Sequence, residues 1–287
     1  MNLKELKARV LPCPKQFALL QADGLLLTCN SRVFLQPEGV DDTTLAAVEE
    51  HLQKHIGKDC LCFSENTVSI TLRLGEPDFP MENREEGYRL TVTGDGVHIT
   101  GFGQTGLLYG IVTFCQLLRW HNGTAELPAL EILDWPEMKM RGLFIETRYG
   151  TNVMEKEDWF QMLDRALEKK LNVMHIGIYG CWTVQYDGRV SEYLYVPVPG
   201  YPRLKTPMTV KYYSPQQDRW IDYEKLPPMY REDFFGEVVR YGKERGITVY
   251  PTWNSLGHNT LAPTQYPETS ARDETGQPSY TGFCTSR

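Results

Sequence analysis

The strongest indication of the fold comes from residues 231–268, REDFFGEVVRYGKERGITVYPTWNSLGHNTLAPTQYPE, because they contain in order the patterns of a helix, a strand and a polar loop. Apolar and aromatic side chains recur at helical spacing over residues 234–241. Arg245 followed by Gly246 is typical of a helix end, with a basic residue in the last turn and glycine just past it. Residues 247–250 are β-branched or aromatic, and they predict a short buried strand.

The loop after this strand is the first candidate site. It includes Trp253, Asn254, His258 and Asn259, which combine hydrogen-bonding groups with an aromatic face. In an α/β barrel, the loops that follow the carboxyl ends of the strands build the active site. We therefore expect Trp253, Asn254 and Asn259 to contact a substrate.

The same run resembles the third strand of the family 20 glycoside hydrolases, the β-N-acetylhexosaminidases. In that family a helix ending in Glu-Arg-Gly-Ile precedes a strand, a Pro-Gly-His turn and a Tyr-Pro-Glu run. Gly257-His258 and residues 266–268 match this pattern. The chain departs from it at Leu256, where proline is usual, and at Asn254 and Ser255, where an acidic residue is usual. The alternative is that Gly257-His258 is only a strand-exit turn with a solvated histidine.

Two earlier motifs extend the resemblance in the order that the family has them. Residues 86–88 read Glu-Gly-Tyr before a predicted hairpin, and residues 106–110 read Gly-Leu-Leu-Tyr-Gly within a predicted helix. The small N-terminal domain of these hydrolases is built in the same order. We interpret Tyr88 and Tyr109 as core residues, since aromatic side chains at such positions usually pack inside.

The expected fold is an α+β N-terminal domain over residues 1–137, followed over residues 138–287 by the first part of a (β/α)8 TIM-type barrel. The N-terminal part mixes strands and helices instead of alternating them. Its expected strands are residues 17–20, 25–28, 68–74, 87–93, 97–101 and 130–133, and its expected helices are residues 42–54 and 105–120.

The barrel part begins after the boundary Asp134-Trp135-Pro136, with strands expected at residues 141–146 and 172–178 and a helix at residues 157–170. About three βα units of the eight in a barrel are present, and three cannot close it. We therefore expect a truncated barrel, a fragment of a longer protein, that self-associates through its open sheet edge.

The resemblance also implies roles for individual residues. A family arginine after the first strand holds sugar hydroxyls, and Arg148 is the nearest match, with a surface ion pair as the alternative. Trp182 corresponds out of register to a family tryptophan after the second strand. His258 corresponds to the histidine that supports the catalytic acid through a hydrogen bond.

The chemistry that the resemblance implies is removal of a terminal β-linked N-acetylhexosamine by a substrate-assisted, retaining mechanism. The substrate's 2-acetamido oxygen attacks the anomeric carbon, so the enzyme supplies no nucleophile. The acid is the glutamate of an Asp-Glu pair after the fourth strand. The pair Asp273-Glu274 follows no predicted strand, and we interpret it as a solvated turn. We therefore expect the acid to lie outside this chain and the chain alone to be inactive.

Two other functions stay open. The first is a non-catalytic carbohydrate-binding protein on the same scaffold, which the altered second loop favours. The second is another barrel hydrolase that acts on acetamido sugars. Residues 190–226 form a long insertion rich in aromatic residues and proline, and we hypothesise that it is a lid or wall over the sugar site.

The composition argues against nucleic acid and membranes as binding partners. The formal charge of −7 argues against a nucleic-acid surface. No apolar run has the length of a membrane span, and the start lacks the apolar core of a signal peptide. The seven cysteines form no scaffold-like pattern and indicate reduced thiols in a cytoplasmic protein. The resemblance implies N-acetylhexosamine-containing glycans as partners, and the composition argues against nucleic acid and membrane.

The sequence predicts no cofactor and no metal site. His51 and His55 are four residues apart on a predicted helix, a spacing that can bind zinc. No third ligand has a suitable sequence spacing, so we interpret the pair as part of an exposed helix face. Residues 101–106 contain a G-x-G-x-x-G run, but the antiparallel hairpin before it is not the context of a dinucleotide site.

Overall fold

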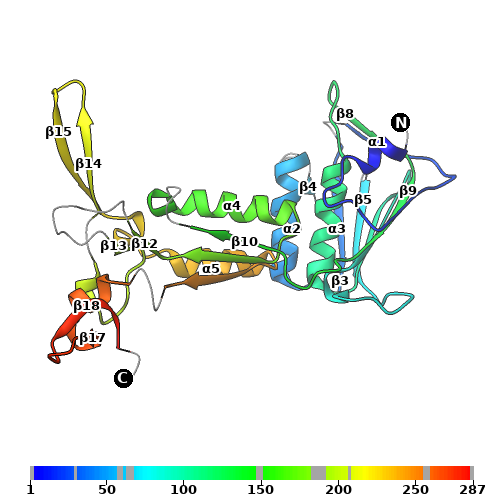
Figure 1. The fold of residues 1–287 in the computed structure, drawn as a ribbon. Helices are drawn as coiled ribbons and strands as arrows, with labels where there is room; N and C mark the ends of the chain where they lie inside the picture. Colours follow the sequence, from blue (N-terminus) through cyan, green and yellow to red (C-terminus); the bar gives the residue numbers. More distant parts are fainter. Residues whose placement is uncertain are drawn as a thin grey trace. The chain divides into compact units, whose positions relative to one another are not determined.

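A computed structural model describes residues 3–28, 31–56, 61–62, 68–146, 151–181, 192–205, 208–254 and 259–284 (Figure 1). The chain divides into two compact units. Unit 1 comprises Met1–Arg141, Leu163–Asn172 and Lys243–Ile247; unit 2 comprises Gly142–Met162, Val173–Gly242 and Thr248–Arg287. Parts of the predicted second domain thus belong to the first unit.

Unit 1 is built on a seven-stranded mixed sheet with strand order β1-β9-β6-β7-β5-β3-β4. The predicted hairpin is confirmed, because β6 and β7 pair antiparallel in register from Tyr88↔Gly101 to Thr93↔Gly96. Strand β5 joins this hairpin by pairing parallel with β7. The strands are β1 (Gln16–Leu19), β3 (Val33–Glu38), β4 (Leu61–Cys62), β5 (Val68–Leu74), β6 (Tyr88–Thr93), β7 (Gly96–Gly101) and β9 (Leu130–Asp134).

Two further strands stand apart from this sheet. Strand β2 (Leu25–Thr28) pairs antiparallel with β8 (Thr124–Leu127), whereas β1, just before it in the chain, pairs with β9. The two strands expected at residues 17–20 and 25–28 therefore belong to different sheets. Sequence reading did not predict β3, β4 or β8.

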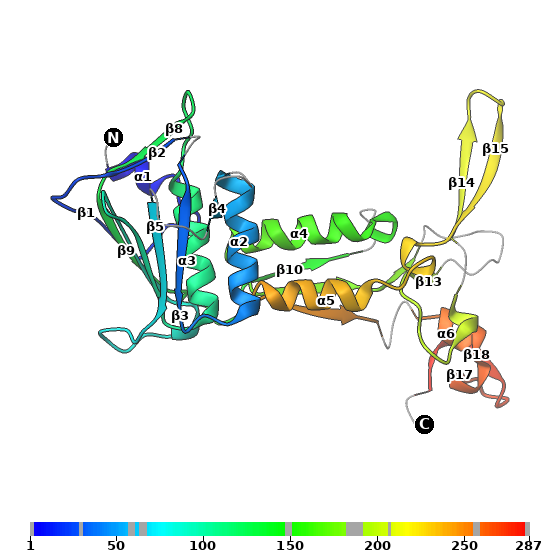
Figure 2. The same ribbon diagram turned by 180° about the vertical axis from the view of Figure 1, so that it is seen from behind.

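Two helices cover the sheet of unit 1, and a short α1 (Leu3–Lys7) precedes it. Helix α3 (Gln104–Leu117) packs against β5, β6 and β7, and α2 (Asp42–Ile56) lies beside α3 (Figures 1 and 2). Asp41 caps α2, since its Oδ1 accepts a hydrogen bond of 2.7 Å from the Thr44 amide. Gly106 permits the close approach of α3, because a Cβ there would lie 2.0 Å from the Gly87 carbonyl oxygen.

Glu86, the first residue of the Glu-Gly-Tyr motif, is part of a hydrogen-bonded network inside unit 1. Asn172 donates from Nδ2 to Glu86 Oε1 over 2.8 Å and accepts from the Arg141 amide over 2.9 Å. The Arg141 guanidinium lies 2.6 Å from Glu86 Oε2 and donates to the Lys170 carbonyl over 2.9 Å. Tyr109 is 1% exposed and accepts from Arg141 over 3.3 Å. These residues are structural, and the prediction that Tyr109 is a core residue is confirmed.

A buried ion pair between Lys170 and Asp134 lies close to this network in unit 1. Lys170 Nζ donates to Asp134 Oδ2 over 2.9 Å and to the Tyr88 hydroxyl over 2.8 Å. That hydroxyl also lies 2.5 Å from Thr113 Oγ1. Tyr88 is 1% exposed, which confirms it as a core residue. Asp134, expected only to mark a boundary, is a buried charge partner.

Arg245 ends its helix as predicted, and it also has a role that the sequence did not reveal. Its guanidinium is buried and donates from Nε to Asp164 Oδ1 over 2.7 Å, with a second contact to Glu50. Lys54 lies 2.5 Å from Asp164 and 2.9 Å from Glu50. Burial alone would raise the pKa of Asp164, but hydrogen bonds from Lys54 and Arg245 outweigh it and lower that pKa. Gly246 follows with φ of +70°, the left-handed turn that favours glycine after a helix.

Unit 2 contains three parallel strands in the order β10-β11-β16. They are β10 (Gly142–Ile145), β11 (Val173–Gly177) and β16 (Thr248–Thr252), close to the predicted positions. Helix α4 (Lys156–Glu168) connects the first two, and α5 (Phe235–Glu244) precedes the third. The rings of Phe160 on α4 and Tyr241 on α5 stack at 4.0 Å. The prediction that residues 247–250 are wholly buried is wrong, because Tyr250 is 46% exposed at an edge of this sheet.

The rest of unit 2 consists of short antiparallel pairs and a short helix, α6 (Leu261–Gln265), which lies against β17 and β18 (Figure 2). The long insertion contains β13 and the hairpin β14–β15. The pairs are β12 (Tyr179–Cys181) with β13 (Glu192–Leu194), β14 (Met208–Ser214) with β15 (Arg219–Lys225), and β17 (Ser270–Arg272) with β18 (Pro278–Phe283).

Two sequence expectations need correction here. Asp273-Glu274 was expected to follow no strand, but it forms the turn between β17 and β18. His51 was expected on an exposed face, but it is 6% exposed because its side of α2 packs against α3.

Among the described residues, no helix is both long and apolar enough to cross a membrane.

Candidate functional site

The candidate site lies at the carboxyl ends of the three parallel strands of unit 2. Because the strands are parallel and in register, with Gly177 opposite Thr252, the residues that follow them emerge at one sheet edge. The Ile178 amide donates to the Thr252 carbonyl over 3.0 Å and extends this alignment past the strand ends. Glu146, Tyr179 and Trp253 are therefore brought to the same edge, as expected for a barrel-type site.

Trp253 contacts two other aromatic rings at the carboxyl ends of these strands. Its ring stacks on Tyr179 at 6.4 Å and 19°, and it meets Phe283 edge-on at 6.4 Å. Its indole Nε1 is buried and has no hydrogen-bond acceptor among the residues that the structure describes. An aromatic face beside an N–H donor that no described residue engages is suited to a ligand with one apolar face and hydroxyl or carbonyl acceptors.

The two asparagines expected at the site are placed differently. Asn254 is exposed, directly after Trp253. Asn259 is only 1% exposed, so it belongs to the interior of the loop. His258, Arg148 and Trp182 lie outside the described residues, and their roles stay predictions.

Glu192 fixes the far end of the loop, a role that sequence reasoning missed. It is 7% exposed on β13, and its Oε2 accepts hydrogen bonds from the amide and hydroxyl of Thr260 and, over 2.9 Å, from the Leu261 amide. These bonds satisfy free N–H groups at the start of α6. A lone glutamate in an aperiodic insertion gives no signal that would identify this contact.

Replacing Glu192 with alanine should loosen the loop around residues 259–261. Hydrogen bonds to a charged group contribute about 1.5–3 kcal/mol each, and part of that is lost here. We expect amide exchange of Leu261 to be at least about tenfold faster in E192A. E224A, which removes an exposed glutamate of β15, is the matched control and should leave the rate unchanged. Equal exchange rates at Leu261 in E192A and the parent chain would show that this contact does not hold the loop.

The described carboxylates near the chain's end do not fit the role of a general acid. Hydrogen bonds from Thr275 and from the backbone of residues 275–277 lower the pKa of Asp273, whereas a general acid needs a raised pKa. Glu268 is exposed and lies 3.7 Å from Arg203. The interpretation of Asp273-Glu274 as a solvated turn is confirmed by its exposure.

Comparison with known sequences identifies two adjoining matches. Residues 7–135 match domain 2 of glycosyl hydrolase family 20, and residues 139–286 match the catalytic domain of that family. A β-hexosaminidase from Akkermansia muciniphila is 31% identical over 184 residues, which are 64% of this chain and 34% of the relative. The β-hexosaminidase subunit β from Sus scrofa is 27% identical over 208 residues, covering 71% of this chain and 34% of the relative.

Solved structures show the same fold. The family 20 β-N-acetylhexosaminidase from Streptomyces coelicolor superposes with a TM-score of 0.70 at 20% identity, covering 98% of this chain and 54% of that one. The exo-β-N-acetylglucosaminidase from Vibrio harveyi, solved in complex with N-acetylglucosamine, gives a TM-score of 0.68 at 17% identity, covering 97% and 42%. The chain spans about a third of the length of the curated relatives it matches. It belongs to glycosyl hydrolase family 20, of which it contains domain 2 and part of the catalytic domain.

Proposed function

We propose that this chain is part of a glycosidase that removes terminal β-linked N-acetylhexosamine from glycans. The supporting observation is the Trp253 platform at the carboxyl ends of three parallel strands, in a chain of family 20. The matched relatives are named β-hexosaminidases, and one neighbour holds N-acetylglucosamine. The non-catalytic binder is the second candidate, and no described contact favours it.

The proposed mechanism is the substrate-assisted one, with the acetamido oxygen of the substrate as nucleophile. The acid and the carboxylate that orients the acetamido group come from outside this sequence, in a further part of a TIM-type barrel. The sequence contains one Asp-Glu dipeptide, Asp273-Glu274, and hydrogen bonds lower the pKa of its aspartate in an exposed turn. His258 supports the acid, and Arg148 and Trp182 contact the sugar.

Dependence on the acetamido group tests this mechanism. In a protein that carries the chain within a full catalytic domain, the p-nitrophenyl β-N-acetylglucosaminide should be cleaved far faster than the matching β-glucoside, which lacks the nucleophile. Equal rates on the two substrates would contradict acetamido participation, while family membership would stand.

The role of Trp253 is tested by two substitutions in that longer protein. W253A removes the aromatic face, and aromatic stacking contributes about 0.5–1.5 kcal/mol, so KM should rise about two- to tenfold with a smaller change in kcat. W253F keeps a face but loses the N–H donor and should give an intermediate KM. An unchanged KM in W253A would remove Trp253 from the sugar site.

We also propose that the hairpin β14–β15 forms a wall of the sugar site. Its tip exposes Trp220 and Tyr213, whose rings meet edge-on at 5.8 Å. Exposed aromatic side chains of this kind are enriched at surfaces that bind a ligand or partner. Deleting the hairpin should weaken sugar affinity, and unchanged affinity would contradict the role. Self-association through the open sheet edge and a cytoplasmic location stay predictions.

A further inference from the structure

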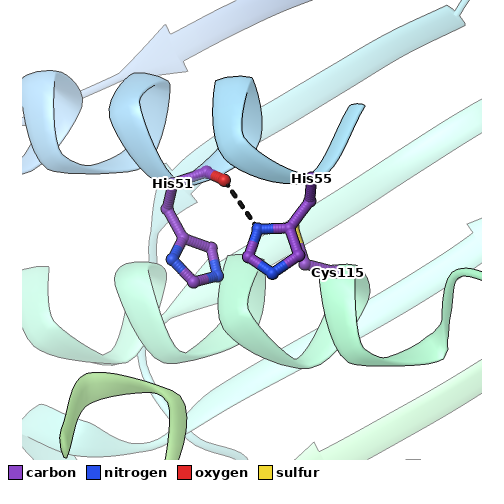
Figure 3. Close-up of side chains that lie close together, drawn as sticks. All are labelled: His51, His55 and Cys115. Carbon is purple, nitrogen blue, oxygen red and sulfur yellow. Dashed lines mark hydrogen bonds between the residues drawn. The ribbon is translucent and has the colours of Figure 1, made fainter. Parts of the chain in front are cut away.

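A second cluster of reactive side chains lies in unit 1. His51 and His55 are one turn apart on α2, and Cys115 reaches them from α3 (Figure 3). The ligand atoms of the three side chains all lie within 4.8 Å of one another. Cys115 could not be predicted as a third ligand, because it is far from the histidines in sequence and only the packing of α2 on α3 brings it close to them.

The three side chains are oriented as metal ligands are, and two of them are buried while His55 is partly exposed. His51 is 6% exposed and Cys115 is 3% exposed. The two imidazole rings lie 4.4 Å apart, and both extend from α2 toward α3 in Figure 3. His55 Nδ1 lies 2.9 Å from the His51 carbonyl oxygen. Because a carbonyl can only accept, Nδ1 carries the proton and Nε2 is left with a free lone pair, as in a metal-bound histidine.

The cluster opens into a cavity of about 330 Å³. Gln116 braces its wall through hydrogen bonds to the Leu11 and Glu168 carbonyls of 3.0 and 2.7 Å. Arg9, Arg119 and Lys169 also line it, with Glu168 as the one carboxylate. One carboxylate is too few for hard ions such as Mg²⁺ and Ca²⁺, which need several oxygen ligands. The cavity leaves room for a water molecule or an anion as a fourth ligand of a bound metal ion.

We propose that His51, His55 and Cys115 form a binding site for a thiophilic divalent transition metal ion of the zinc class, with the fourth position open to this cavity. Two imidazoles and one thiolate are a ligand set that zinc uses. Zn–N and Zn–S bonds place tetrahedral ligand atoms about 3.3–3.6 Å apart, so the side chains must close by about 1 Å. Binding replaces the S–H bond of Cys115 with a metal–sulfur bond and releases the thiol proton to solvent through the cavity.

Cobalt provides the direct test, because a thiolate bound to Co²⁺ gives a charge-transfer absorption in the near ultraviolet. The chain, treated with chelator and reductant, should bind Co²⁺ with this absorption, and Zn²⁺ should displace it while Mg²⁺ should not. C115S should abolish the cluster's absorption, and H55Q should lower Co²⁺ affinity at least about tenfold. C13S, which alters an exposed cysteine outside the cluster, is the matched control and should retain it.

Alkylation gives a second readout that does not depend on how well C115S folds. Zn²⁺ should protect Cys115 from maleimide in the parent chain, as read by mass spectrometry of the peptide, and should leave Cys13 reactive. A parent chain without the absorption, or a C115S chain that is folded by circular dichroism and keeps it in full, would overturn the site. So would equal alkylation of Cys115 with and without Zn²⁺ at a reaction time at which the metal-free chain is alkylated.

Discussion

Replacing Lys170 with methionine is expected to lower the unfolding free energy of unit 1 by about 3–5 kcal/mol, the usual cost of leaving a buried charge without its partner. Lys170 and Asp134 have side chains only 6% and 10% exposed, and their charged atoms lie 2.9 Å apart. Methionine keeps the length of the side chain but leaves Asp134 and Tyr88 without the ammonium donor. The φ of +54° at Lys170 is equally unfavourable for both residues, so backbone strain does not contribute.

Native-state amide exchange on β6 and β9 measures this loss locally, which matters because the chain has two units and need not unfold in one step. Leu90 and Ile132 face each other in register and report on these strands. Adding Asp134→Asn to K170M should recover much of the loss, since no charge is then left unpaired. A loss below about 1 kcal/mol in K170M would show that water reaches Asp134 and that the pair is not buried in solution.

Acidification is expected to destabilise unit 1 through His51. Burial, with a smaller contribution from the neighbouring His55, lowers the pKa of His51 from 6.5 to about 3. The unfolded chain takes up a proton at this residue below pH 6.5, whereas the folded chain does so only near pH 3. The unfolded state therefore binds more protons between these values, and stability falls as pH falls through that window. At about 1.4 kcal/mol per pH unit, the loss has an upper limit of about 5 kcal/mol.

The variant H51L separates this effect from the carboxylates. Glu50 and Asp164 also have lowered pKa values, despite burial that alone would raise them, because Lys54 and Arg245 bond to them. Their stabilisation is lost in acid as well, so the parent chain loses more than one contribution. Unfolding between pH 7 and 4, with chelator present, should show a smaller pH dependence in H51L. H98L, at an exposed histidine of β7, should match the parent, and a parent-like dependence in H51L would rule out His51 as the source.

The periodic elements could be predicted from the sequence because their signal is local. The apolar faces of α2 and α3 and the β6–β7 hairpin appear where the pattern places them. The expected extension of α3 to residue 120 is wrong because Leu118 is already extended, with ψ of 133°. Strand β3 was missed because Pro37 and Glu38 interrupt its apolar run, and β4 is only two residues long.

Partners far apart in sequence could not be predicted in the same way. Lys170 and Asp134 are 36 residues apart, and Asn172 and Glu86 are 86 residues apart. Glu86 belongs to the Glu-Gly-Tyr motif of the resemblance, and the structure gives it a packing role in unit 1 through its contacts with Arg141 and Asn172. Of the predicted site, Trp253 lies at the strand ends as expected, whereas Glu192 gave no signal because it acts through the backbone of a distant loop.

Release of p-nitrophenol from its β-N-acetylglucosaminide tests the proposed function most directly. It should be measured for this chain alone and for a protein in which the chain is part of a full catalytic domain. We expect release only from the longer protein, because the acid that protonates the leaving oxygen is proposed to lie outside these residues. Efficient release by the chain alone would contradict this, and Glu146, Asp187 and Glu268 would then be the carboxylates to substitute.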